Sequence, residues 1–487
     1  MSTSQSLAKN TLLLTAASVG QKVIAFFYFA LIARTIGVES TGAYFLALAM
    51  ITTIGVVDDL GLTSVLIREV ARAPERATEW LRNTIGVKLL AIPVTVAVAL
   101  FVPSLFGYDG DAARLVQIAI FIMLADTMSL TFYGVLRGLH QLKYESMGIF
   151  VGQMLSALLG ATFILTGHAT LPLLVTALIV GSVWNAVFSI VHVVRRLGWV
   201  ALRPTFSLGF APLRAASAFF LAAVFVKIYS YIDSFTLQAV IGSAAVGLYS
   251  VAYKLTYAFQ FLPLAFVGAL YPTLAANAHD NKKLREVFLD AEWYMALLAA
   301  PIVFGIFALA PEIIAFFYGV DYAGSVAPLS ILIFVLLAIF LDFPVGSLLN
   351  ATGKQSTKTV IMGLTMVINA IANIVLIPRV GVSGASIAAV ISFAFMFAAG
   401  WAMLPKELHL TLGNLLRRVG GLLLAGAVMS ATVIACKQVI PWMLTVPVGV
   451  VVFFAVAFVT KSFTFNHLRA FRKLLTRPSY ASTPADN

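Results

Sequence analysis

Apolar residues run along this chain in long, nearly uninterrupted stretches separated by short polar turns. A stretch of about 20 apolar residues is long enough to cross a membrane as a helix. The pattern therefore predicts fourteen transmembrane helices, near residues 11–36, 40–62, 84–106, 112–136, 147–166, 171–194, 213–238, 244–272, 290–310, 327–349, 358–378, 382–404, 415–438 and 441–461.

Composition supports this interpretation, because 61% of the residues are hydrophobic and only 11% are charged. These fractions exclude a water-soluble globular protein of this length and predict an all-α membrane protein. The first stretch is expected to stay in the mature protein, since Gln21 and Lys22 interrupt it and no convincing cleavage site follows.

Most of the 32 basic residues fall on one side of the membrane if the N-terminus is placed in the cytoplasm. Lys and Arg concentrate in cytoplasmic loops, so we expect both termini to be cytoplasmic. The net charge of +12 then reflects topology and contact with anionic membrane lipids. Nucleic acid is not expected as a partner, since the basic residues are not interleaved with aromatic stacking positions.

A repeat relates the two halves of the chain. The pattern I-G-x4-G-x-Y occurs at residues 36–44 and again at 241–249, an offset of 205 that also places Lys22 on Lys227. After the fourth and tenth predicted helices, polar turns align through Gln141 and Gln355, an offset of 214.

The repeat predicts two pseudo-symmetric six-helix lobes around a central cavity. We expect an N-terminal lobe at 1–200, a C-terminal lobe at 201–410, an appended helix pair at 411–461 and a polar cytoplasmic tail at 462–487. Two repeated lobes with ionisable residues at midplane depth are typical of an alternating-access carrier.

Lysine at the middle of a membrane helix costs about 2.5 to 3.5 kcal/mol on insertion scales, so Lys22 should face a partner or a wet cavity. Segments 213–238 and 244–272 form the most polar pair of helices in the chain. One interpretation is an internal Lys-to-Asp salt bridge that holds these helices together, with the tyrosines as packing and interfacial anchors. The other, which we favour, is a hydrated cavity lined by lysines. Of the adjacent Asp58 and Asp59, we expect one to pair and the other to face the interior.

No loop exceeds about 25 residues, so the chain has no room for a soluble catalytic or nucleotide-binding domain. We therefore expect no enzyme activity, no cofactor and no metal. A membrane-embedded glycosyltransferase is the enzyme-class alternative, and the acidic loop Asp109-Gly110-Asp111 would be its signature. That loop is too short and too isolated to hold a metal, and a solvated turn is expected.

Three stretches resemble bacterial polysaccharide flippases, a family of the multidrug, oligosaccharidyl-lipid and polysaccharide exporter superfamily. They are LIARTIGVESTGAY from residue 31, LRGLHQ from residue 136 and LIPRVGVSGA from residue 376, and the resemblance extends over roughly residues 10–460.

The resemblance implies transfer of an undecaprenyl-pyrophosphate-linked oligosaccharide from the cytoplasmic to the outer leaflet, for O-antigen or exopolysaccharide assembly in the bacterial inner membrane. The cavity lysines would bind the pyrophosphate, and tyrosines would stack on sugars. The implied binding residues are Lys22, Lys227, Lys254, Arg34, Tyr229, Tyr253 and Tyr257.

Five aspartates are expected to pair with the lysines in the empty cavity or to carry a coupling ion, and the sequence does not choose between these roles. They are Asp58, Asp59, Asp126, Asp233 and Asp342. The expected partners are the lipid-linked oligosaccharide, membrane lipids, and a polysaccharide polymerase with other proteins of the pathway. A multidrug cation antiporter and a lipid II flippase, both of the same superfamily, are the alternatives.

Overall fold

The structure, a computed structural model, describes residues 3–105, 111–208, 211–277 and 279–464, and these residues form helices and turns but no β-strand. Short 3-10 turns join several helices: η1 (Pro74–Arg76), η2 (Trp199–Leu202), η3 (Ala258–Gln260), η4 (Val320–Ser325) and η5 (Lys406–Leu408). The helices are α1 (Thr3–Asp59), α2 (Leu62–Arg72), α3 (Ala77–Leu105), α4 (Asp111–Gly138), α5 (Leu142–Leu165), α6 (Leu171–Leu197), α7 (Ala211–Val240), α8 (Ser243–Tyr257), α9 (Phe261–Ala276), α10 (Asn281–Tyr318), α11 (Val326–Leu332), α12 (Phe334–Ala351), α13 (Gln355–Val380), α14 (Val382–Ala402), α15 (Leu412–Cys436) and α16 (Trp442–Val459).

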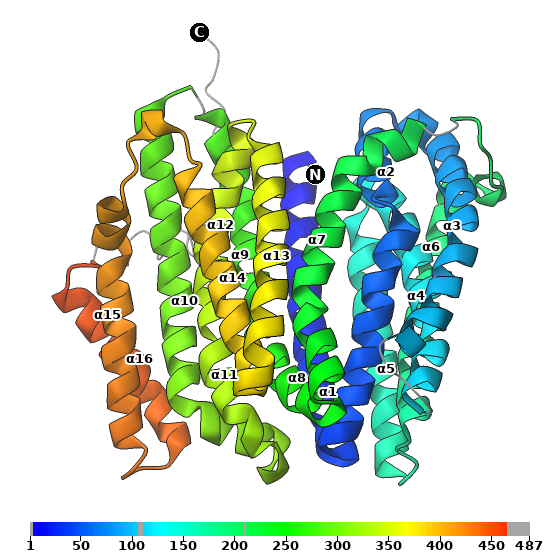
Figure 1. Cartoon of the computed structure of the whole chain (residues 1–487). Helices are drawn as coiled ribbons and strands as arrows, with labels where there is room; N and C mark the ends of the chain where they lie inside the picture. Colours follow the sequence, from blue (N-terminus) through cyan, green and yellow to red (C-terminus); the bar gives the residue numbers. More distant parts are fainter. Residues whose placement is uncertain (1–2, 106–110, 209–210, 278, 465–487) are drawn as a thin grey trace.

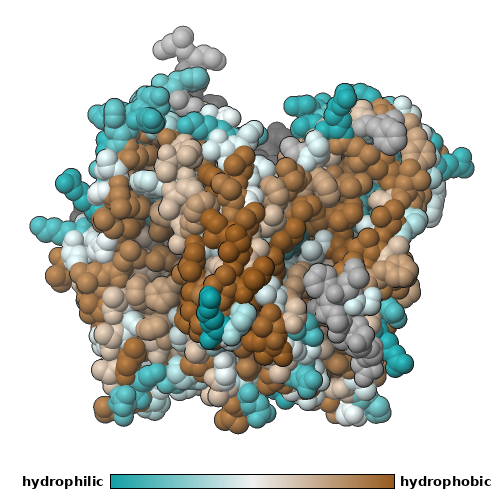
Figure 2. All heavy atoms as spheres, viewed as in Figure 1, coloured by the Kyte–Doolittle hydropathy of each residue, from teal (hydrophilic) through white to brown (hydrophobic). Residues whose placement is uncertain are grey.

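Among the described residues, 12 helical stretches are long and apolar enough to span a membrane. On the face shown in Figure 2, apolar side chains cover most of the middle of the molecule, and polar side chains gather toward both ends. The chain is therefore a multi-pass, all-α membrane protein, as predicted. The expected count of fourteen stays a prediction, because α1 counts once although Gly37 divides it, and α8 and α9 are each too short to count.

Two groups of helices lie side by side in Figure 1. The first bundle contains α2 to α6 and the part of α1 that follows Gly37; the second contains α9 to α16. Between them, α7 packs on α13, and α8 packs on α1. The lobe boundaries expected from the sequence remain a proposal, but the two bundles place α1, α7 and α8 at the centre of the molecule.

The repeated I-G-x4-G-x-Y segments adopt the same backbone turn. Gly37 has φ 79° and ψ 174°, and Gly242, at the repeat offset, has φ 115° and ψ −178°. Positive φ with extended ψ is accessible almost only to glycine. In α1 the turn reverses the chain, so the two halves of this helix run in opposite directions (Figure 1).

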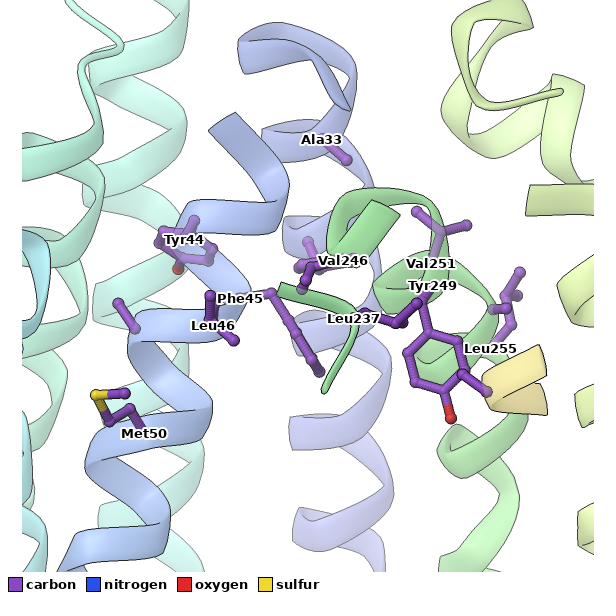
Figure 3. Packing of buried hydrophobic residues seen from close by; sticks show 14 of the residues in the cluster. Ala33, Tyr44, Phe45, Leu46, Met50, Leu237, Val246, Tyr249, Val251 and Leu255 are labelled. Carbon is purple, nitrogen blue, oxygen red and sulfur yellow. The ribbon is translucent and has the colours of Figure 1, made fainter. Parts of the chain in front are cut away.

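These two turns pack directly on each other at the end of the molecule away from the N-terminus. A β-carbon at Gly42 would collide with the backbone oxygen of Ser243, and one at Gly247 would collide with the backbone oxygen of Val38. The contact is symmetric in the repeat, because Gly42 corresponds to Gly247 and Val38 corresponds to Ser243 at the offset of 205. Figure 3 shows the buried side chains around the crossing, including Phe45 of α1 and Tyr249 of α8.

Other boundaries differ from the predicted ones. The span predicted at 244–272 is interrupted by η3 at Ala258–Gln260, and the span predicted at 327–349 is interrupted at Ile333. The span predicted at 290–310 is one helix of 38 residues that starts at Asn281, where the side chain of Asp280 accepts hydrogen bonds from the backbone of Lys282 and Lys283. This N-cap extends α10 by two turns.

The turn before α5 and the turn before α13 have the same backbone structure, but the residue offset between them is one less than the offset given by aligning the two glutamines. Gln141 donates its backbone N–H to Leu136, and Lys354 donates in the same way to Leu349. The residue before each, His140 and Gly353, has positive φ. The structural equivalence is therefore 213 and not 214, because hydrogen bonding and not residue identity sets the turn.

Candidate functional site

A cavity of about 700 Å³ lies between the central helices and the first bundle. Its walls come from α1, α4 and α5, from α6, and from α7 and α8. One end lies at Arg137 and Glu145, in the last turn of α4 and the first turn of α5, which form an ion pair. Figure 2 shows a notch between the bundles at the end of the molecule where the N-terminus lies in Figure 1.

Lysines from α7 and α8 form one wall of this cavity. Lys227 and Lys254 both line it, next to Gln21 and Tyr231. Lys22 is exposed on α1 and lies close enough to interact electrostatically with both. The structure thus brings together the three lysines that the sequence predicted for a central site.

The contacts of these lysines are aromatic. The Nζ of Lys227 lies 5.9 Å from the ring centre of Tyr231, and the Nζ of Lys254 lies 5.3 Å from Phe29 and 5.5 Å from Phe45. Within the described part of the chain, no carboxylate forms an ion pair with any of the three. An aromatic face stabilises a cation only partly, so the wall keeps a net positive potential that is available to an anion.

Asp233 does not pair with Lys227, as the salt-bridge interpretation required. It is buried on α7, where it accepts hydrogen bonds from the hydroxyl of Tyr249 and the amide of Asn373, each at 2.6 Å. The same amide also contacts Asn369 on α13. Asp233 therefore belongs to a polar cluster that joins α7 to α8 and α13, and sequence reasoning missed both asparagines of this cluster.

Asp58 and Asp59 have different environments, as expected for neighbours on a helix. Asp59 lines the cavity and forms an ion pair of 2.9 Å with Lys88, whose side chain is fully buried on α3. Lys88 also donates to the backbone oxygen of Thr127. Asp58 is fully buried near Lys88, without a hydrogen bond that meets normal geometry. The sequence placed Lys88 with the cytoplasmic charges and missed this pairing.

The remaining two aspartates lie in different bundles. Asp126 on α4 lines the cavity beside Ser182. Asp342 on α12 contacts Lys358 on α13 through both carboxylate oxygens at 2.7 Å, away from the cavity. Glu292 on α10 is fully buried close to Asp342, and its oxygens have no hydrogen-bond partner in the described part of the chain.

Five of the predicted binding residues are not part of the cavity lining: Lys22, which lies beside it, and Arg34, Tyr229, Tyr253 and Tyr257. Tyr253 packs between Tyr231 and Tyr257, with ring centres 6.0 and 4.3 Å away, behind the lysine wall. Tyr229 packs edge-on against Phe393. Arg34 is exposed near Gly319, toward the end of the molecule away from the N-terminus. In this conformation the tyrosines support the wall and do not face a ligand.

No cluster of three metal-ligating side chains occurs in the described residues. Asp109 and Gly110 of the acidic loop lie outside the described residues, as does the tail from residue 465.

Comparisons with known proteins agree with this architecture. The model of the polysaccharide biosynthesis protein family matches residues 7–278, and the MatE family model matches residues 218–375. The probable low-salt glycan biosynthesis flippase Agl15 of Haloferax volcanii is 22% identical over 393 residues, covering 80% of this chain and 81% of that protein. The succinoglycan biosynthesis transport protein ExoT of Rhizobium meliloti is 23% identical over 306 residues, covering 60% and 58%.

Two solved structures share the fold. The lipid II flippase MurJ in an inward closed conformation has a TM-score of 0.71 at 17% identity, covering 95% of this chain and all of MurJ. An inward-facing multidrug resistance transporter of the MATE family has a TM-score of 0.65 at 16% identity, covering 82% and 98%. Because the first family model spans more than half of the 487 residues, the chain belongs to the polysaccharide biosynthesis protein family.

Proposed function

We propose that this protein is an alternating-access flippase that moves an undecaprenyl-pyrophosphate-linked oligosaccharide from the cytoplasmic to the outer leaflet. The observation that supports it most is the lysine wall, formed by Lys227 and Lys254 with Lys22 nearby, between the two bundles. Two relatives that match most of the chain are named a probable low-salt glycan biosynthesis flippase and a probable flippase. The protein is a transporter and not an enzyme.

Electrostatics decides between this function and cation export. A pyrophosphate must leave water to cross the membrane, and lysines without carboxylate partners supply charge-assisted hydrogen bonds of about 1.5 to 3 kcal/mol each. A cationic drug would meet the same lysines and be repelled. Two carboxylates of the lining already have basic partners, Asp59 with Lys88 and Glu145 with Arg137. Among the lining carboxylates that the structure describes, this leaves Asp126 to attract a cation.

The orientation of the protein in the bacterial cytoplasmic membrane follows from the distribution of charge. The arginine-rich segment of α2 and η1 lies at the end where α1 begins (Figure 1). Basic residues favour the cytoplasmic side, so the notch at that end faces the cytoplasm. In this proposed orientation the reciprocal glycine contact closes the outer side, and substrate enters the cavity from the cytoplasm.

The leaflet distribution of lipid-linked glycan in cells tests this function. We expect deletion of the gene to trap the glycan on the cytoplasmic leaflet, and wild type but not Lys227→Ala to restore it to the outer leaflet. Lys283→Ala, an exposed lysine on α10, is the matched control and should restore it fully. Lipid II that accumulates in place of a surface-polysaccharide precursor would identify a peptidoglycan flippase. A normal glycan distribution with new sensitivity to cationic drugs would instead identify an antiporter.

A further inference from the structure

Beyond the Arg137–Glu145 ion pair, α5 and α6 line the cavity with neutral hydrogen-bonding side chains. On α5, Gln153 and Ser156 line the cavity, and on α6, Ser182 and Asn185 do so. We call these four residues the polar patch. Each pair is separated by three positions, which places both members on one face of their helix. None of the four carries a charge, in contrast to the lysine wall.

A shared sequence pattern creates the patch. The lining positions of α5 are 145, 149, 152, 153 and 156, and those of α6 are 178, 181, 182 and 185. From positions 149 and 178 onward, both helices present the order apolar, glycine, polar, polar. Gly152 and Gly181 let the two backbones touch, because a β-carbon at Gly152 would lie 2.9 Å from the Gly181 oxygen. The polar side chains that follow them are thereby held beside each other at the cavity surface.

Hydrogen-bonding capacity remains available in this patch. Asn185 donates to the backbone of Gly181 and accepts from the hydroxyl of Tyr133, both at 3.1 Å, so its orientation is fixed while part of its amide stays free. Gln153 is partly exposed and forms no hydrogen bond with the described residues. Its amide offers two donors and one acceptor to a ligand.

The carboxylate of Asp126, next to the patch, also favours hydroxyl groups of a ligand over its phosphate groups. Asp126 lies beside Ser182 and lines the same wall. A carboxylate repels a pyrophosphate but accepts strong hydrogen bonds from hydroxyl groups. A cavity of about 700 Å³ falls in the range of sites that hold drug-sized ligands, so a short stretch of sugar units fits across it from the lysine wall.

We propose that the polar patch binds the first sugar units of the lipid-linked oligosaccharide while the lysine wall holds the pyrophosphate. This proposal rests on the proposed flippase function. The patch aligns amide and hydroxyl side chains on two helices. These groups can form hydrogen bonds with the closely spaced hydroxyl and acetamido groups of a sugar, whereas a lipid tail offers no hydrogen-bonding group. The patch thus gives the cavity affinity for the glycan, beyond the affinity for the anion that all such lipids share.

Binding measurements with two ligands separate the glycan from the pyrophosphate. The full chain in nanodiscs is titrated with undecaprenyl pyrophosphate without sugar, and with the oligosaccharide-linked form purified from the deletion strain. We expect Gln153→Leu to weaken binding of the linked form about three- to tenfold, as for one hydrogen bond lost, and to leave the sugar-free ligand unchanged. Unchanged binding of that ligand also shows that the variant is folded. Lys227→Ala should weaken both.

Gln117→Leu provides the matched control, because Gln117 is exposed on α4 and outside the cavity lining. If wild type binds both ligands equally, or if Gln153→Leu weakens both to the same degree or neither, the polar patch does not bind sugar, although the flippase function still stands. If wild type binds neither ligand, the flippase function itself fails and the patch proposal fails with it.

Discussion

At the scale of single residues, the central feature is positive charge without a negative partner. Lys227 and Lys254 line the cavity with only aromatic faces against them in the described structure. The aspartates nearby are engaged elsewhere: Asp59 with Lys88, and Asp233 with Tyr249 and Asn373. Because these two carboxylates have partners of their own, they do not neutralise the lysines, whose charges stay available for a ligand.

The ion pair between Asp342 and Lys358 provides a prediction about stability. Both side chains are largely buried, and removing one partner of a buried pair typically costs about 3 to 5 kcal/mol. We therefore expect Asp342→Asn to lower the midpoint of thermal unfolding of the detergent-purified protein strongly. Asp342→Leu combined with Lys358→Met should recover most of the loss, since no charge is then left unpaired.

Glu79→Gln is the comparison for this prediction, because Glu79 pairs with Arg76 at an exposed site. Exposed pairs contribute little, so this variant should unfold at nearly the wild-type midpoint. Equal midpoints for Asp342→Asn and Glu79→Gln would contradict the structural role of the buried pair.

Some of these residues were visible in the sequence and others were not. Lys22 and Lys227 were predicted because lysine at midspan is costly and therefore informative, and the repeat set their register. Lys88 and Asn373 were missed because their partners lie on helices distant in sequence, so no local pattern pairs them. Arg34 was placed in the cavity only by resemblance, and the structure places it near Gly319 instead.

At the scale of elements, the reciprocal contact between α1 and α8 closes one end of the molecule. At Gly42 and at Gly247, the backbone of the other turn occupies the position that a β-carbon would take. The hydroxyl of Tyr322 reinforces this end by hydrogen bonds to Thr41 and to the backbone of Ala33. An alternating-access cycle must break this contact to release substrate, so its strength sets how often the outer side opens.

Adding a methyl group to one of the glycines should open this end. Gly247→Ala introduces a β-carbon that collides with the Val38 oxygen, whereas Gly420→Ala on α15 meets nothing within 4 Å. The test uses Thr41→Cys in a chain whose single cysteine is removed by Cys436→Ser. We expect a membrane-impermeant maleimide to label the cysteine at position 41 only when Gly247→Ala is also present. Equal labelling with Gly247→Ala and Gly420→Ala would show that the contact is not a closure.

The sequence predicted these turns but not the break within its most polar span. Glycine at Gly37 and Gly242 marks a backbone that other residues rarely adopt, so the turn could be inferred directly. The interruption at Ala258–Gln260 itself contains neither glycine nor proline, but Pro263 follows it in the first turn of α9. Proline has no N–H to donate to the carbonyl four residues earlier, so a helix tends to break before it. The span prediction did not use this local signal.

At the scale of the whole molecule, the central helices and the first bundle enclose one cavity whose walls differ in chemistry. The central helices supply Lys227 and Lys254, and α5 and α6 supply neutral hydrogen-bonding groups near Asp126 of α4. Figure 2 shows the notch between the bundles at the end of the molecule where the N-terminus lies in Figure 1. This arrangement predicts a ligand with an anionic group and a neutral polar group, held between two groups of helices that move relative to each other.

Transport in proteoliposomes that contain only this protein and the oligosaccharide-linked lipid tests this account most directly. The fraction of glycan that an added, membrane-impermeant glycosidase can reach is followed with time. We predict that wild type and Lys283→Ala expose glycan from the opposite leaflet, and that the double variant Lys22→Ala, Lys227→Ala does not. Equal exposure with the double variant, at equal amounts of folded protein, would contradict the central role of the lysine wall.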